Sequence, residues 1–344
     1  MNDQTTRGHE RLIHASLLAG AIGDSLGADI EFWDIKDISE EFPEGIHQLS
    51  TQASRGAGWF TDDTQMALWT AEGLVEAEWD GSAGIQSKTT LVKSVHEGLL
   101  LWLQTQNGKC PVKVRLKAPL LEDRRMWFQA APGTTCMSSL SQSRSLGAEA
   151  SNNSKGCGTI MRVAPIALGL PSEMVWDMAF RTSALTHGHP SGKIAAAAWA
   201  SILSEVLHGA VLDQAIQTAL DRCEQLYRDG TSHETQTAIL SALSARLDGA
   251  PETVETLGQG WVAEEALSIA LYSVLASQGS FERGLQIAVT HSGDSDSTGA
   301  IAGNLLGLLY PDQVFEHRWS GELGGSDLIS RSARGLARLS SRSG

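Results

Sequence analysis

Residues 61–78 read TDDTQMALWTAEGLVEAE, a segment that joins two adjacent acids to an apolar pattern of helical period. The apolar positions recur at the spacing of one helix face: Met66, Leu68, Trp69, Leu74 and Val75. Similar patterns recur along most of the chain, and the strict alternation typical of β-strands is almost absent. The sequence therefore predicts an all-α fold.

Apart from 61–78, helices are expected over residues 12–26, 90–103, 173–185, 192–207, 212–227, 233–247, 263–277, 281–290, 299–310 and 327–339. Glycine and proline mark long loops over 42–59, 108–133 and 249–260. No internal repeat and no interdomain linker is visible. We therefore expect a single domain over residues 11–340, preceded by a flexible N-terminal arm over 1–10.

Composition narrows the class of protein. The 344 residues are 42% hydrophobic and 19% charged, as in a soluble globular protein, with a formal net charge of −14. Nucleic-acid binding needs a basic face, so nucleic acid is not expected as a partner. No run reaches the ~18 apolar residues that a membrane span needs, so no membrane partner is expected either.

The cellular compartment follows from two further features. The cysteines Cys110, Cys136, Cys157 and Cys223 form no CxxC pair, which is typical of free thiols in a reducing compartment. The apolar run over 12–22 is interrupted by a histidine and followed at once by an acid, which argues against a signal peptide. A cytoplasmic location is expected.

A second acidic cluster, Asp294-Ser295-Asp296-Ser297, also lies where a glycine-containing loop meets a helix-periodic segment. Carboxylate oxygens are the ligands that Mg²⁺, Mn²⁺ and Ca²⁺ prefer, and the two clusters together have the donors to hold two such cations. The alternative is helix capping, because Ser, Thr and Asp are the preferred N-caps and helix dipoles favour acids there. One cap needs only one acid, so the doubled acids favour the cation hypothesis.

Other known types of site match the sequence less well than a carboxylate cation site does. The run from Asp294 begins like an EF-hand, but Leu305 stands where a bidentate Glu is required. Ser297 replaces the second glycine of a nucleophile elbow around Ser295. The segment over 20–27, GAIGDSLG, places three glycines and an acid in an expected helix, which permits either close helix packing or close approach of a ligand.

Five segments, in this order, resemble the ADP-ribosylglycohydrolase family: GAIGDSLGADIEF from Gly20, GWFTDDTQMAL from Gly58, KGCGTIMRVAPIALGL from Lys155, ALTHGHP from Ala184, and HSGDSDSTGAIAGNLLG from His291. The resemblance covers roughly residues 11–311. It implies an all-α orthogonal helical bundle with a binuclear Mg²⁺ or Mn²⁺ site in a central cleft.

The resemblance also implies roles for individual residues. It implies metal ligands at Thr61, Asp62, Asp63, Asp294, Asp296 and Ser297. It implies catalytic residues at Glu31, Asp62 and Asp296. It places four residues along the bound ADP-ribose: Gly156, Gly158, Met161 and His187.

The sequence departs from the family pattern at two places. Many relatives carry Asn where Cys157 stands. Some relatives carry an aspartate, proposed as a base, in a Pro-x-Asp-x-Gly loop, whereas the comparable loop here, residues 131–135, reads APGTT. A mechanism that depends on that aspartate is not carried over.

The implied activity is metal-dependent hydrolysis that removes ADP-ribose from a modified protein side chain, with arginine as the expected acceptor and two Mg²⁺ (or Mn²⁺) as cofactors. Glycosidic cleavage passes through an oxocarbenium-like state that positioned acids stabilise. One alternative is an antitoxin or immunity protein of the same fold that also blocks an ADP-ribosyltransferase. Another is a non-catalytic member that only binds ADP-ribose. The intact set of acids favours the hydrolase.

Overall fold

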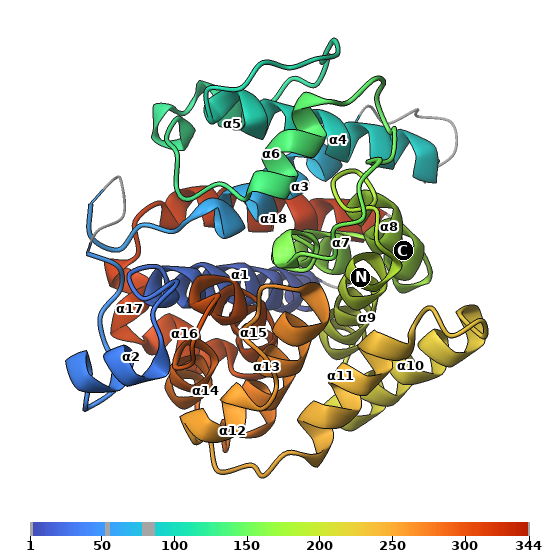
Figure 1. Cartoon of the computed structure of the whole chain (residues 1–344). Coiled ribbons are helices and arrows are strands. Elements are labelled where there is room, and N and C mark those ends of the chain that lie inside the picture. The colour runs from blue at the N-terminus through green and yellow to red at the C-terminus, as the bar shows by residue number, and fades with distance from the viewer. Residues whose placement is uncertain (1–2, 52–55, 78–86, 343–344) are drawn as a thin grey trace.

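The computed structural model describes residues 3–51, 56–77 and 87–342, and within these residues it contains α-helices and no β-strand (Figure 1). The only β-type pairing in the described part is an isolated bridge between Gly156 and Val262. The predicted all-α fold class is confirmed. None of the described helices is both long enough and apolar enough to cross a membrane.

The α-helices are α1 (Asp3–Gly27), α2 (Ile35–Glu41), α3 (Asp62–Val75), α4 (Lys88–Thr105), α5 (Pro119–Glu122), α6 (Thr134–Ser141), α7 (Ala164–Gly169), α8 (Ser172–Ser183), α9 (Pro190–Leu207), α10 (Leu212–Leu226), α11 (His233–Ser244), α12 (Pro251–Glu255), α13 (Ala263–Leu275), α14 (Phe281–Val289), α15 (Ser295–Leu309), α16 (Pro311–Glu316), α17 (Arg318–Glu322) and α18 (Ser326–Arg342). Two single-turn 3₁₀ helices, Arg124–Met126 and Cys157–Thr159, complete the described elements.

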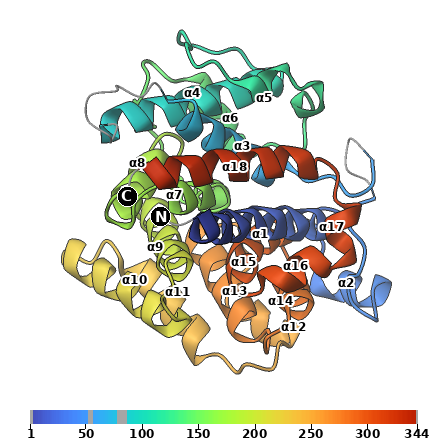
Figure 2. The ribbon, with the colours of Figure 1, turned by 180° about the vertical axis from the view of Figure 1, so that it is seen from behind.

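Helix α1 runs through the middle of the molecule. Figures 1 and 2 show it between α18 and α3 on one side and the group α13, α14 and α15 on the other, with α4, α5 and α6 forming an outer layer beyond α3. A contiguous core of buried apolar side chains extends from Ile13 in α1 to Leu339 in α18. The C-terminal helix α18 therefore packs against the N-terminal helix α1.

Glycines let α1 and α15 pack backbone against backbone. A Cβ on Gly23 would lie 2.0 Å from the carbonyl oxygen of Gly299, and a Cβ on Gly303 would lie 2.2 Å from that of Ala19. At the end of α1, a Cβ on Gly27 would lie 2.4 Å from the amide nitrogen of Asp296. The glycine-rich segment thus serves close helix packing, and this packing brings the start of α15 against the end of α1.

All eleven expected helices are present, and apart from the start of α1 their ends differ from the expected ones by a few residues. Helix α3 begins at Asp62, because the Thr61 side chain caps it, and ends at Val75. The predicted end at Glu78 lies outside the described residues. Helix α1 begins at Asp3, within the stretch expected to form an arm, and the mobility of that stretch stays a prediction.

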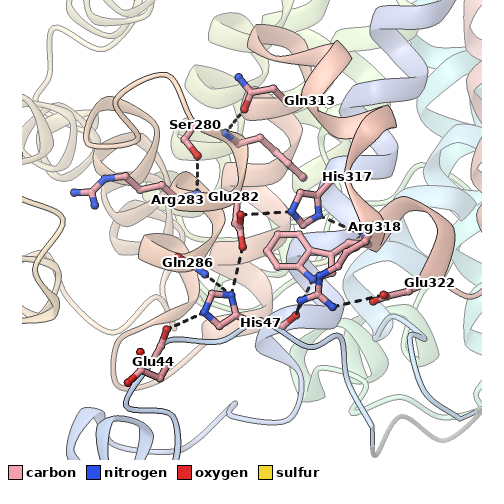
Figure 3. Close-up of polar contacts among 12 residues, drawn as sticks. Glu44, His47, Ser280, Glu282, Arg283, Gln286, Gln313, His317, Arg318 and Glu322 are labelled. Carbon is pink, nitrogen blue, oxygen red and sulfur yellow. Dashed lines mark hydrogen bonds and ion pairs between the residues drawn. The ribbon is translucent and has the colours of Figure 1, made fainter.

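The segment after α2 carries no helix over residues 43–51, as expected, and His47 fastens it to the C-terminal half (Figure 3). The His47 Nδ1 atom lies 3.3 Å from Glu282 Oε1 on α14. Its main-chain carbonyl accepts a hydrogen bond of 2.9 Å from Trp319 Nε1 on α17. These contacts hold the chain around His47 against α14 and α17.

Candidate active site

The first turns of α3 and α15 meet at a cavity of about 460 Å³. Ten of the eleven residues expected in the site line this cavity: Glu31, Asp62, Asp63, Asp294, Asp296, Ser297, Gly156, Gly158, Met161 and His187. Thr61 lies behind the lining, where its hydroxyl is 3.4 Å from Asp63 Oδ2. Segments from both ends and the middle of the chain therefore converge on one cavity.

Helix capping does not account for the acids. The α3 cap is the Thr61 side chain, which accepts from the backbone N–H of Asp63. Asp294 occupies the N-cap position of α15, but its side chain makes no capping hydrogen bond. The acids of both first turns are nevertheless buried, and a buried carboxylate needs compensation by partners or by a cation.

The carboxylates of the site lie close to one another. Glu31, Asp294 and Asp296 each offer an oxygen within 4.8 Å of the others. Burial, reinforced by repulsion between the acids, raises the pKa of Asp63 well above its usual range and raises the pKa of Glu31 to about 9. Among the described residues, no Lys or Arg side chain forms an ion pair with these carboxylates.

The donors fit a hard divalent cation. Asp63 Oδ1 is buried and has no hydrogen-bond partner, an arrangement that native structures rarely tolerate without a ligand. The surrounding carboxylate oxygens and the Ser297 hydroxyl match the ligand preferences of Mg²⁺ and Mn²⁺. Three sulfur-bearing side chains, Cys136, Cys157 and Met161, also line the cavity, and the Sγ of Cys157 donates to Asp294 Oδ2 at 2.8 Å.

Asp24 is a site residue to which sequence reasoning gave no role. Its carboxylate accepts from the backbone N–H of Thr61 at 2.8 Å and from that of Thr64 at 3.0 Å, so it ties α1 to the start of α3. Burial, followed by the charge of Asp296, raises the pKa of Asp24 to about 7. The sequence feature that could have identified Asp24 is the presence of an acid inside an otherwise apolar helix.

The glycine pair of the 3₁₀ turn gives the cavity a flat wall beside His187. A Cβ on Gly156 would lie 3.3 Å from His187 Nε2, and a Cβ on Gly158 would lie 2.8 Å from the Sγ of Cys136. The amide of Gly156 donates to Ser154 and that of Cys157 donates to the carbonyl of Trp261, so both are occupied. Glycine at these two positions therefore leaves room for the side chains of His187 and Cys136.

The loop over 131–135 also borders the cavity. The backbone N–H of Gly133 donates to Asp62 Oδ2 at 3.2 Å, and Asp62 N donates to the carbonyl of Ala130 at 3.1 Å. Ala131 has a φ of 51°, in the left-handed region that a residue with a side chain seldom adopts. The loop that carries an acid in some relatives here positions Asp62 through its backbone.

Two aromatic side chains at the cavity were not predicted from the sequence. Phe32 stacks on Trp261 with ring centroids 5.0 Å apart, and it is 70% exposed. Its φ of 72° places it in the left-handed region, and its N–H donates to the carbonyl of Gly293, just before Asp294. A strained, exposed aromatic residue directly after Glu31 indicates a position shaped for contact with a ligand.

Comparisons with known proteins identify related sequences and a related fold. A family model described as ADP-ribosylglycohydrolase matches residues 5–344. The chain is 25% identical over 330 residues to the ADP-ribosyl-[dinitrogen reductase] glycohydrolase of Rhodospirillum rubrum, covering 92% of this chain and 90% of that protein. A solved structure described as an ADP-ribosylglycohydrolase-related protein complex superposes with a TM-score of 0.66 at 23% identity, covering 97% of this chain and 99% of that one.

Proposed function

Because the chain belongs to the ADP-ribosylglycohydrolase family, a family of glycosidic-bond hydrolases, we propose that it removes ADP-ribose from arginine side chains of modified proteins in a reaction that needs divalent cations. The observation that carries this proposal is the convergence on one cavity of buried carboxylates from α3 and α15 that, among the described residues, form no ion pair with Lys or Arg. The catalytic unit is a single domain over residues 11–340.

The cations are two Mg²⁺ or Mn²⁺ ions held by the residues of the two acidic clusters: Thr61, Asp62, Asp63, Asp294, Asp296 and Ser297. The proximity of Glu31 to Asp294 and Asp296 makes it a further candidate ligand. Bound there, the ions would orient the ribose hydroxyls and lower the pKa of a bound water. The residues behind the acids, Asp24 and Gly133, hold the carboxylate array in place.

The protein's own residues divide the remaining work. Glu31 lies between the acids and the exposed Phe32, where a carboxyl group can exchange a proton with the scissile linkage. Asp62 and Asp296 stabilise the positive charge that develops on the ribose ring. Gly156, Gly158, Met161 and His187 form the wall along which the remainder of ADP-ribose lies.

Charge around the cavity supports arginine as the acceptor. A groove that shares Phe32 with the cavity is lined by Trp33 and the acids of α2, Asp37, Glu40 and Glu41. A guanidinium group pairs with carboxylates and stacks on aromatic rings. An arginine-rich surface of an acceptor protein would therefore meet complementary chemistry beside Glu31.

The test is incubation of the purified chain with a protein ADP-ribosylated on arginine and, in parallel, with one modified on serine. Release of free ADP-ribose from the arginine substrate, lost in EDTA and restored by Mg²⁺ or Mn²⁺, is the expected result. Binding of ADP-ribose without release would identify a non-catalytic member, and inhibition of a transferase without release would identify a blocking protein. Undiminished release in excess chelator would overturn the cation requirement.

A further inference from the structure

Arg162 is an arginine buried beneath the cavity wall without a carboxylate partner. It is 3% exposed, and its guanidinium donates to the carbonyl oxygen of Gly158 and, at 3.3 Å, to that of Thr182. Its NH2 atom also donates to the Thr186 hydroxyl at 2.7 Å. The charge of Asp62 acts on the guanidinium from beyond ion-pair distance. Burial of a charge without a paired carboxylate is costly, so the position calls for an explanation beyond packing.

The Thr186 hydroxyl connects Arg162 to His187. Because Thr186 Oγ1 accepts from the guanidinium, its single proton must point elsewhere. The Nδ1 atom of His187 lies 2.8 Å from this oxygen, whereas the carbonyl of Ser183 lies 3.5 Å away. A further acceptor among the described residues is the Cys136 thiol, and sulfur accepts hydrogen bonds weakly.

This arrangement selects one tautomer of His187. A neutral imidazole that accepts at Nδ1 carries its proton on Nε2. Burial and the charge of Arg162 lower the pKa of His187 to about 3, so the ring is neutral at physiological pH. The Nε2 atom faces Gly156, at the wall of the cavity, where a Cβ would lie 3.3 Å from it.

We propose that Arg162 and Thr186 are positioning residues that hold His187 as a neutral Nε2–H donor, aimed at a phosphate or hydroxyl oxygen of the ligand that lies along Gly156 and Gly158. The inference rests on the proposed function, which supplies an ADP-ribose ligand with such oxygens. In the opposite tautomer, the Nε2 lone pair would repel a phosphate oxygen and could only accept a hydrogen bond from a hydroxyl. The buried guanidinium thus acts through Thr186 on His187, and it determines that Nε2 of His187 is the hydrogen-bond donor to the ligand.

The first experiment is ¹⁵N NMR of the histidine side chains in the wild-type protein without ligand or cations, with His187→Asn used to assign the signal. The expected result is a neutral ring protonated at Nε2 and unprotonated at Nδ1. This readout requires neither binding nor turnover, so it stands if the proposed function fails. A ring protonated at Nδ1 would overturn the proposal.

The second experiment compares Thr186→Val, which removes the hydroxyl at nearly constant shape, with Thr186→Ser, which keeps it. For Thr186→Val we expect the Nε2–H signature to be lost and calorimetric affinity for free ADP-ribose to fall about tenfold, the effect of one hydrogen bond. Thr186→Ser should retain both. Wild-type affinity and an unchanged tautomer in Thr186→Val would contradict the relay, that is, the chain of hydrogen bonds from Arg162 through Thr186 to His187.

The controls separate this inference from its premise. If wild-type protein shows the Nε2–H tautomer but binds no ADP-ribose, the proposed function fails while the relay stands. If Thr186→Val does not fold, Arg162→Lys replaces it as the test. Lysine keeps the positive charge but lacks the planar guanidinium, so this variant should also lose the Nε2–H signature. A variant of Arg162 with the wild-type tautomer would remove the arginine from the relay.

Discussion

At the residue scale, the carboxylates of the cavity oppose folding when no cation is present. Asp24, Asp62 and Asp63 are buried, and burial raises the pKa of each above the value it has in an unfolded chain. A folded state that holds protons more tightly than the unfolded state loses stability as the pH rises. Cation binding to the folded state alone would offset this loss.

The free energy of unfolding of the cation-free protein should therefore fall with pH. The ordinary pKa of Asp24 is 3.8 and its folded value is about 7, so its contribution is complete below about pH 4 and is lost as the pH rises to about 7. Urea unfolding in EDTA across this range measures the slope. Asp63→Asn should flatten it, whereas the exposed control Glu224→Gln should not. A slope of opposite sign in the wild-type protein would contradict the account.

Glu31 is predicted to act on turnover rather than on ligand binding. Glu31→Gln keeps the size of the side chain but cannot exchange a proton, so kcat should fall by roughly 10²–10⁴. Affinity for free ADP-ribose, measured by calorimetry, should stay within a few-fold of the wild-type value. Turnover close to wild type would assign the proton transfer to another group.

At the element scale, the site depends on how closely α1 and α15 pack. Gly23 on α1 and Gly299 on α15 face each other across the contact, and a Cβ on Gly299 would lie 2.4 Å from the carbonyl oxygen of Gly23. Both partners are backbone atoms, so a methyl group there can be accommodated only by moving one helix. Such a movement would also displace Asp296.

Gly299→Ala should therefore lower both stability and cation affinity. Overpacking of this kind costs about 1–3 kcal/mol, which thermal unfolding detects, and Mn²⁺ titration should show weaker binding. Gly8→Ala is the matched control, because it makes the same substitution in α1 where a Cβ meets nothing within 4 Å. It should leave both quantities unchanged or raise stability. Equal behaviour of the two variants would refute the packing argument.

The long helices and the acidic clusters could be predicted from the sequence because each carries a repeated signal. In helices of nine residues or more, apolar residues recur at helical spacing over more than two turns. Helices α5 and α17, with 4 and 5 residues, are too short to show this pattern. Arg162 and Trp261 were missed because a single residue in an apolar segment looks like any core or loop position. Their partners come from elements that are distant in the sequence.

At the scale of the whole molecule, the bundle brings together α3, near the start of the chain, and α15, near its end. The acids of α3 and α15 are separated by most of the chain, and they meet because α1 contacts both helices. The glycine wall and His187 come from the middle of the sequence. The fold thus assembles the acidic cavity from three parts of the chain that have no local connection.

The most direct test of this assembly is anomalous diffraction from a crystal soaked with Mn²⁺. The account predicts two peaks in the cavity, each within coordination distance of carboxylates from both clusters, Asp62 or Asp63 and Asp294 or Asp296. The same soak of an Asp296→Asn crystal should lose at least one of the peaks. The absence of any peak between α3 and α15 in the wild-type crystal, at a Mn²⁺ concentration that supports release of ADP-ribose, would contradict it.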